Sequence, residues 1–363
     1  MKFNKLGLLF MAGAVLLAAC GGTTDSSNKS SSSETAGSQQ VNNDVKTVAF
    51  ITDTNGVDDR SFNQSAWEGM VEWGDENGLT RGNSGYQYFQ SSNESDYIPN
   101  IDQALNAGFQ TVFGIGYKLV SSMEEQAKAN PNVNFVMVDE VISGLDNVVS
   151  ATFKSEEAAY LAGLAAAYTT KTDKVGFIGG VQVAVIEVFD AGFRQGVADA
   201  AKDLGKDIKV VSQYAGAFDA PDKGRTIAQA MYAQDIDVIY AAAGATGNGL
   251  FQEAKSLNEV QDKKVWVIGV DRDQTEEGNY EKDGEKLNFT LASTLKQVGE
   301  TVKDLATKAN SGEFPGGEHI VYGLEEEGVG LTDGQLTEDV KNKIETARQA
   351  IIDGTITVKA TLK

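Results

Sequence analysis

Residues 48–53 read VAFITD, a short apolar run that ends in a carboxylate. A segment with apolar residues at three- and four-residue spacing follows at residues 62–77, and this spacing is typical of an amphipathic helix. The same unit, an apolar run of strand length followed by a helix-period segment, recurs along most of the chain. Strand–helix–strand repetition predicts parallel sheets with helices on both faces, which is an α/β fold.

The number of apolar runs indicates two sheets, because one continuous sheet of so many strands would be unusual. We therefore expect two sheets of about five or six strands each, in two lobes of ordinary domain size. The first lobe is expected to span about residues 47–150 with part of 275–330, and the second about 151–272 with the C-terminal helix. The expected strands are residues 47–52, 86–90, 111–114, 133–138, 148–152, 174–178, 208–213, 238–242, 265–270 and 287–292, and the clearest helical segments are 62–77, 156–168, 190–204, 223–234 and 247–257.

The N-terminus has the layout of a bacterial secretory signal. Two lysines precede an almost wholly apolar stretch at residues 6–18, which is too short for a comfortable membrane span. Residues 17–20 read LAAC, which resembles a lipobox, and Cys20 is the only cysteine of the chain. We expect a signal peptide at residues 1–19, acylation of Cys20, and a flexible tether rich in Ser, Thr, Gly and Asn at residues 20–46.

Composition excludes several classes of function. A net charge of −21 and a pI near 4.5 argue against nucleic acid and anionic lipid surfaces as partners. His319 is the only histidine, so a His-rich metal site is excluded, and we expect it to be an ordinary surface or strand residue. The glycines at residues 244–249 lack the order of a dinucleotide fingerprint, and the segment from Asp271 lacks the Gly and Glu of a calcium loop. We expect no catalysis, no cofactor and no metal.

Carboxylates and glycines follow the expected strands. Asp53, Asp139 and Asp271 each come directly after an apolar run, and other runs end in glycine. In open parallel sheets, ligands bind beyond the carboxyl ends of the strands. One such Asp is more often a helix cap or a turn residue, but three together favour a binding site that accepts hydrogen bonds.

Several motifs, in order along the mature chain, resemble one known family. Together they are similar to the basic membrane protein (BMP) lipoproteins, the purine nucleoside receptor type of ABC transporter substrate-binding protein. One departure is Ala184, where related sequences tend to carry a proline. The motifs are DDRSFNQSAWEG at 58–69, EEAAYLAG at 156–163, VGFIGG at 175–180, FDAGFRQG at 189–196, GVDRDQ at 269–274 and STLK at 293–296, together with VAFITD at 48–53.

The resemblance implies a type I periplasmic-binding-protein fold, with two lobes joined by three crossovers that close over a nucleoside. It also implies that aromatic rings sandwich the base, that acidic and amide side chains bind the base or ribose, and that a glycine, an acid and a lysine hold the sugar hydroxyls. The resemblance implies that the rings are those of Phe62 and Phe218. It implies that Asp53, Asn63 and Asp139 bind the base or ribose, and that Gly244, Asp271 and Lys296 hold the sugar hydroxyls. From the residues alone, Phe62 could instead be a buried helix residue, and Lys296 a surface residue of a nearby helix.

The resemblance further implies delivery of guanosine, adenosine or inosine to a permease and an ATPase by a monomer anchored at the outer face of the membrane. The tether favours a Gram-positive surface. Two other hypotheses stay open: a receptor for a monosaccharide or another small polar metabolite, and an adhesin-like surface lipoprotein that does not use the pocket. Enzymatic cleavage of nucleosides is a more distant third.

Overall fold

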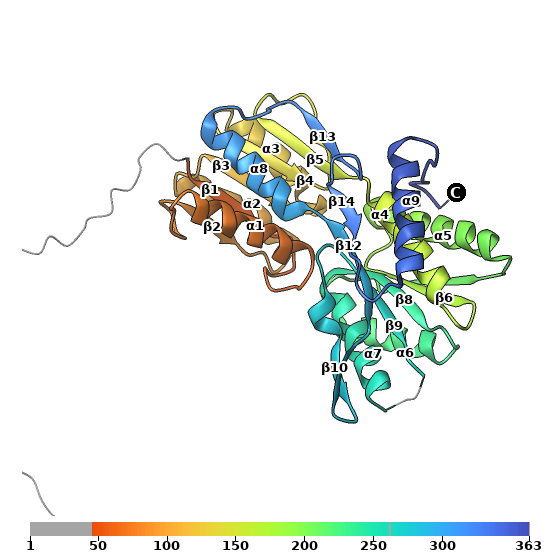
Figure 1. Ribbon diagram of the computed structural model, residues 1–363. Helices are drawn as coiled ribbons and strands as arrows, with labels where there is room; N and C mark the ends of the chain where they lie inside the picture. The colour runs from red at the N-terminus through yellow and green to blue at the C-terminus, as the bar shows by residue number, and fades with distance from the viewer. Residues whose placement is uncertain (1–45, 261–262, 363) are drawn as a thin grey trace, which may run out of the picture. The chain divides into compact units, whose positions relative to one another are not determined.

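The computed structural model describes residues 46–260 and 263–362. The expected signal peptide, Cys20 and all of the expected tether except Lys46 lie outside these residues. The described residues form two six-stranded sheets, here called sheet A and sheet B, and one small hairpin (Figure 1).

Sheet A has the strand order β13-β5-β4-β3-β1-β2, and every neighbouring pair is parallel. Its central strands are completely buried on both faces, as expected of a parallel sheet covered by helices. The strands are β1 (Val48–Ile51), β2 (Tyr86–Phe89), β3 (Thr111–Ile115), β4 (Asn134–Val138), β5 (Val148–Phe153) and β13 (His319–Tyr322), and the helices are α1 (Phe62–Glu76), α2 (Tyr97–Asn106), α3 (Val120–Ala129) and α8 (Val298–Ser311).

Sheet B has the order β14-β12-β9-β8-β6-β7, in which only the β14–β12 pair is antiparallel. Its strands are β6 (Lys174–Gly179), β7 (Lys209–Tyr214), β8 (Val238–Ala242), β9 (Trp266–Gly269), β12 (Thr290–Lys296) and β14 (Val329–Leu331), and the hairpin is β10 (Asn279–Lys282) with β11 (Glu285–Asn288). The helices are α4 (Ser155–Thr169), α5 (Ala184–Leu204), α6 (Pro221–Tyr232), α7 (Asn248–Val260) and α9 (Glu338–Ile352); short 3-10 turns occupy Glu94–Asp96, Tyr117–Leu119, Gly244–Gly247 and Thr275–Gly278. The predicted two-lobed, mainly parallel α/β architecture is confirmed.

The chain passes between the two sheets three times: after β5, after β12 and after β13. The expected end of the second lobe near residue 272 is too early, because β12 pairs with β9 and keeps the chain in sheet B as far as Lys296. The expected strand at residues 287–292 is also wrong in its bounds. β11 ends at Asn288 in the hairpin, and β12 begins at Thr290 in sheet B.

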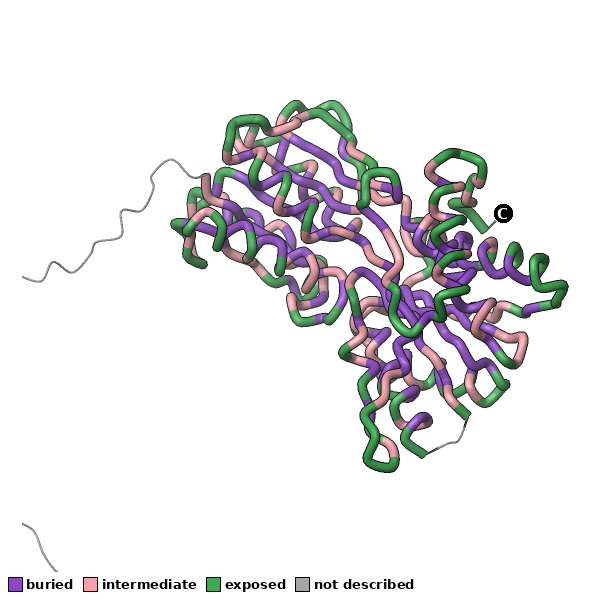
Figure 2. Tube along the Cα trace, viewed as in Figure 1, coloured by how far each residue is buried: buried purple, intermediate pink, exposed green. Residues whose placement is uncertain are grey.

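Helix α4 is buried on almost every side, which agrees with the apolar and small residues found all around it. It packs closely on α5, where a Cβ at Gly196 would lie 2.1 Å from the backbone oxygen of Tyr160. Only glycine allows this approach of the two helix backbones. The buried and exposed segments of both lobes can be followed in Figure 2.

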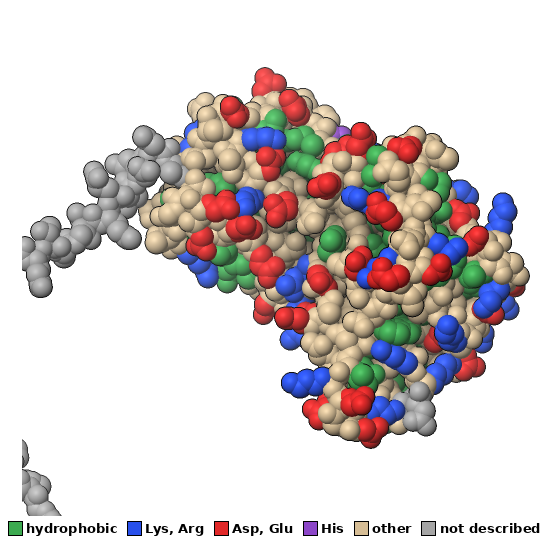
Figure 3. Space-filling view, in the orientation of Figure 1, with side chains coloured by type: hydrophobic (Ala, Val, Ile, Leu, Met, Phe, Trp, Pro, Cys, Tyr) green, Lys and Arg blue, Asp and Glu red, His purple; other side chains and the backbone are tan. Residues whose placement is uncertain are grey.

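The surface carries the net negative charge in a dispersed form. Figure 3 shows Asp and Glu side chains interspersed with Lys and Arg over the face in view. His319 begins β13 as expected of a strand residue, is exposed, and lies with its Nε2 2.7 Å from Thr152 Oγ1. No helix of the described residues is long and apolar enough to cross a membrane.

Candidate ligand-binding site

A pocket opens where the carboxyl ends of strands from both sheets meet. The space between its lining residues is about 550 Å³, part of it open to solvent. All eight residues predicted as ligand contacts line this one pocket, although their contacts with a ligand stay a prediction. They are Asp53, Phe62, Asn63, Asp139, Phe218, Gly244, Asp271 and Lys296.

Two of the strand-end carboxylates have an unusual backbone conformation. Asp139 follows β4 with φ of 72°, and Asp271 follows β9 with φ of 68°. This left-handed conformation is uncommon outside glycine, and such residues cluster at functional sites. At both positions the turn brings a carboxylate into the pocket lining.

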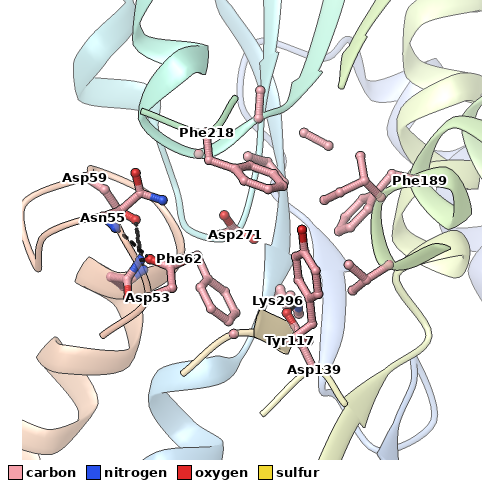
Figure 4. Close-up of a pocket in the computed structure, with 18 residues that line it drawn as sticks. Asp53, Asn55, Asp59, Phe62, Tyr117, Asp139, Phe189, Phe218, Asp271 and Lys296 are labelled. Atoms are coloured by element: carbon pink, nitrogen blue, oxygen red, sulfur yellow. Dashed lines mark hydrogen bonds and ion pairs between the residues drawn. The ribbon is translucent and has the colours of Figure 1, made fainter. Parts of the chain in front are cut away.

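A hydrogen-bonded group of side chains from the β1–α1 connection forms one end of the pocket. Asn63 Nδ2 donates to Asp53 Oδ1 at 2.9 Å and to Asp59 Oδ2 at 3.1 Å. The backbone N–H of Asn55 also donates to Asp53 Oδ1, at 2.8 Å. Figure 4 shows Asp53, Asn55 and Asp59 gathered beside Phe62. Gly116, which lies beside Asp53 and Phe62, has φ of 109°, a backbone conformation that favours glycine.

A buried ion pair joins the two lobes at another part of the pocket. Lys296 Nζ lies 2.6 Å from Asp139 Oδ2, and the two side chains are only 5% and 9% exposed. The same ammonium lies 4.7 Å from the ring centroid of Phe62 and 5.1 Å from that of Phe153. Lys296 therefore belongs to the end of β12 and to the pocket, and the alternative of a surface helix residue is wrong.

Three further contacts link the lobes through residues 59–61. The Ser61 hydroxyl donates to Asp271 Oδ2, Gln274 Nε2 donates to the Arg60 carbonyl at 2.8 Å, and Asn248 Nδ2 donates to the Asp59 carbonyl at 3.3 Å. Residues after β9 and at the start of α7 thus hold the connection before α1 across the pocket.

Aromatic rings enter the pocket from different elements. Phe62 is the first residue of α1, Phe218 lies in the loop after β7, and Figure 4 shows both rings pointing into the pocket. Gly180 makes space for the second ring, because a Cβ there would lie 2.3 Å from two atoms of the Phe218 ring. Phe62 also packs on the core of its own lobe, so it is both a half-buried helix residue and a pocket residue.

Sequence reasoning missed several lining residues. They include Asn55, Asp59, Tyr117 and Phe189. Asp59 gave one local signal, because an acidic residue just before a helix is typical of a cap, and its carboxylate does accept backbone N–H bonds from Ser61 and Gln64. The others follow no strand end directly or sit within a helix, and only the folded chain brings them to the pocket.

Comparison with known proteins identifies the family of this chain. A model described as ABC transporter substrate-binding protein PnrA-like, named Bmp, matches residues 46–361. The chain belongs to this family. The ABC transporter nucleoside-binding protein BmpA of Lactococcus lactis is 51% identical, over 88% of this chain and 91% of that protein. The CD4+ T-cell-stimulating antigen of Listeria monocytogenes is 48% identical, over 86% and 87%.

More distant relatives match nearly the same length of this Bmp-family chain. Basic membrane protein A of Borreliella burgdorferi is 30% identical, over 89% of this chain and 90% of that protein. Among solved structures, an ABC transporter solute-binding protein from Aeropyrum pernix superposes with a TM-score of 0.77 at 24% identity, covering 88% of this chain and 94% of that chain. That likeness confirms the fold of a solute-binding protein. Within the described residues, no group of three or more His, Cys, Asp or Glu could hold a metal ion.

Burial changes the acidity of two site carboxyls in this Bmp-family protein. It raises the pKa of Asp53 from an ordinary 3.8 to about 6, against the opposing effect of N–H donors from Asn55 and Asn63. Burial also raises the pKa of Asp271 to about 6, opposed by the nearby charge of Lys296 and the bond from Ser61. Both groups therefore bind protons more readily in the folded state than in the unfolded state between about pH 4 and pH 6.

This acidity predicts a pH-dependent effect of Asp53→Asn on stability. The stabilising contribution of a raised pKa is complete below about pH 4 and is lost as the pH rises through about 6. We expect the free energy of unfolding of Asp53→Asn, relative to the unchanged protein, to improve by on the order of 2 kcal/mol from pH 4 to pH 7 without ligand. Urea unfolding at several pH values measures it, and parallel curves for the two proteins would contradict it.

Proposed function

We propose that this protein binds nucleosides, purine nucleosides above others, outside the cytoplasm and delivers them to the permease of an ABC transporter. The observation that carries the proposal is the composition of one pocket: the aromatic rings of Phe62 and Phe218 together with the strand-end carboxylates Asp53, Asp139 and Asp271. The L. lactis relative carries the name of a nucleoside-binding protein, which supports the same ligand class.

The chemistry of the pocket suits an unphosphorylated ligand. Stacking a base on an aromatic face contributes roughly 1–3 kcal/mol, and two rings enlarge the contact. Carboxylates only accept hydrogen bonds, so they suit N–H groups of a base and the vicinal hydroxyls of ribose. Among the described residues that line the pocket, Lys296 alone carries a positive charge, and Asp139 already neutralises it. A nucleotide phosphate would require further cations.

The proposed mechanism is closure of the two lobes around the ligand, followed by docking on a permease that works with an ATPase. The contacts between Gln274 and Arg60 and between Ser61 and Asp271 support it, because they join the lobes beside the pocket. We propose further that Cys20 carries the acyl anchor and that a monomer acts at the outer face of the cell membrane.

A ligand panel tests the proposal. The protein is unfolded and refolded to remove bound ligand, and its thermal unfolding is then followed with purine nucleosides, pyrimidine nucleosides, nucleobases and simple sugars. A ligand at 100 times its Kd should stabilise the fold by about 2.7 kcal/mol. We expect a rise in Tm with purine nucleosides and none with ribose. A rise with a sugar but no nucleoside would favour the sugar receptor, and no rise at all would favour the adhesin.

A further inference from the structure

The amide group of Asn63 has its nitrogen fully occupied inside the protein. Nδ2 donates to Asp53 Oδ1 at 2.9 Å and to Asp59 Oδ2 at 3.1 Å, and an amide nitrogen carries only two hydrogens. The amide oxygen, in contrast, is buried without a partner, in a residue that lines the pocket and is 0% exposed. Asn63 therefore offers an incoming ligand an acceptor and no donor.

Asp59 prevents Asn63 from turning its amide around. Its carboxylate accepts backbone N–H groups from Ser61 at 2.9 Å, Asn63 at 3.0 Å and Gln64 at 3.1 Å, which fixes its position before α1. If the amide of Asn63 were reversed, its oxygen would face the carboxylates of both Asp59 and Asp53, and like partial charges would repel. The resemblance had assigned no role to Asp59.

A second unpartnered oxygen lies at the same end of the pocket. Asn55 is 6% exposed, lines the pocket, and its Oδ1 is buried without a partner. The neighbouring Asp53 uses its Oδ1 to accept hydrogen bonds from the backbone N–H of Asn55 and from Asn63 Nδ2. A buried acceptor without a donor is unfavourable, so these oxygens favour a ligand that supplies hydrogens.

We propose that Asp59 is a specificity-determining positioning residue: it fixes Asn63 as an acceptor, so that this end of the pocket selects a ligand edge with adjacent N–H donors. Asp59 acts through Asn63, and it changes the relative affinities of the pocket for different ligands.

Combined with the proposed nucleoside function, on which this step rests, the inference ranks the purine nucleosides. Guanine presents its N1–H and its N2 amino group side by side, and hypoxanthine presents N1–H alone. Adenine places the acceptor N1 beside its N6 amino group, and that acceptor would meet the oxygen of Asn63 or Asp53. The expected order of affinity is guanosine, then inosine, then adenosine.

Titration calorimetry of the full-length protein, refolded to remove ligand, tests the ranking at pH 7.5. We expect guanosine to bind at least about tenfold more tightly than adenosine, since one mismatched hydrogen bond at a buried site has about that effect. 1-Methylguanosine, which lacks N1–H, should bind about tenfold more weakly than guanosine. These ligands test the inference without any substitution.

The variant Asp59→Asn tests the positioning role. It frees the amide of Asn63 to rotate and to offer an N–H, so the guanosine-to-adenosine affinity ratio should fall at least about fivefold. A purely structural role would weaken both ligands by the same factor and leave the ratio unchanged. The matched control is Asp58→Asn, which removes the same charge from an exposed neighbour that does not line the pocket and should keep the ratio.

The outcomes separate this inference from the proposed function. If nucleosides bind but adenosine equals or exceeds guanosine, or if Asp59→Asn keeps the ratio, the inference is wrong and the nucleoside function stands. If no nucleoside binds, both the inference about Asp59 and the proposed nucleoside function are wrong. If Asp59→Asn does not fold, the guanosine, inosine, adenosine and 1-methylguanosine series on the unchanged protein still decides the ranking.

Discussion

Replacing Lys296 by methionine is expected to lower the free energy of unfolding of the ligand-free protein by about 3–5 kcal/mol. The substitution keeps an apolar stem of similar length but removes the ammonium that lies 2.6 Å from Asp139. Asp139 then stays buried as an unpaired carboxylate, and the opposing effect of the Lys296 charge on Asp271 is also lost. The pKa of Asp271 should therefore rise above its value of about 6.

Urea unfolding of a matched set measures this effect. Lys303→Met is the control, because Lys303 pairs with Glu72 and Glu76 at the surface, where an ion pair contributes about 1 kcal/mol or less. The double variant Lys296→Met with Asp139→Asn should recover much of the lost stability, since neither charge is then left buried alone. A loss of under about 1 kcal/mol in Lys296→Met would contradict a buried ion pair between the lobes.

Replacing Phe62 by leucine is expected to weaken nucleoside binding by about 1–3 kcal/mol, which is roughly 5- to 150-fold in Kd. Leucine keeps most of the apolar volume at the start of α1 but has no aromatic face for a base. Phe218→Leu should have an effect of the same order, and the double variant should bind too weakly to detect at micromolar concentrations. Both rings line the pocket, so the loss should appear in the affinity for nucleosides.

The control for the aromatic substitutions is Phe314→Leu. Phe314 is also a half-buried phenyl group of the same core cluster as Phe62, but it does not line the pocket. Calorimetric titration should show nucleoside affinity unchanged in this variant. Equal affinity in Phe62→Leu and the unchanged protein would remove the stacking role and with it the main reason for preferring a base-containing ligand.

Much of the fold could be predicted from sequence because its strands are locally encoded. β1, β4 and β6 are short, largely apolar runs, which is how a strand buried on both faces must read. β13 and β14 were missed because they are edge strands of four and three residues, of which only Val329 is buried. The β10–β11 hairpin does carry a local signal, the turn pair Asp283-Gly284 between its two strands.

The candidate site, like the fold, could be predicted from sequence only in part. Strand-end residues such as Asp53 could be placed from the rule that ligands bind at the carboxyl ends of parallel strands. The pairing of Lys296 with Asp139 joins residues 157 positions apart, and Ser61 bonds Asp271 over 210 positions. No local pattern encodes such contacts, since they depend on how the chain returns between the lobes. The family resemblance predicted eight residues of the site, and the structure shows which side chains contact one another there.

The most direct test of nucleoside binding by this protein is the calorimetric titration of the refolded protein with guanosine, repeated with ribose. We expect saturable binding of one guanosine per chain, a negative heat-capacity change as the ring faces of Phe62 and Phe218 are buried, and no measurable heat with ribose. Saturable binding of ribose with no response to guanosine, adenosine or inosine would contradict the nucleoside assignment.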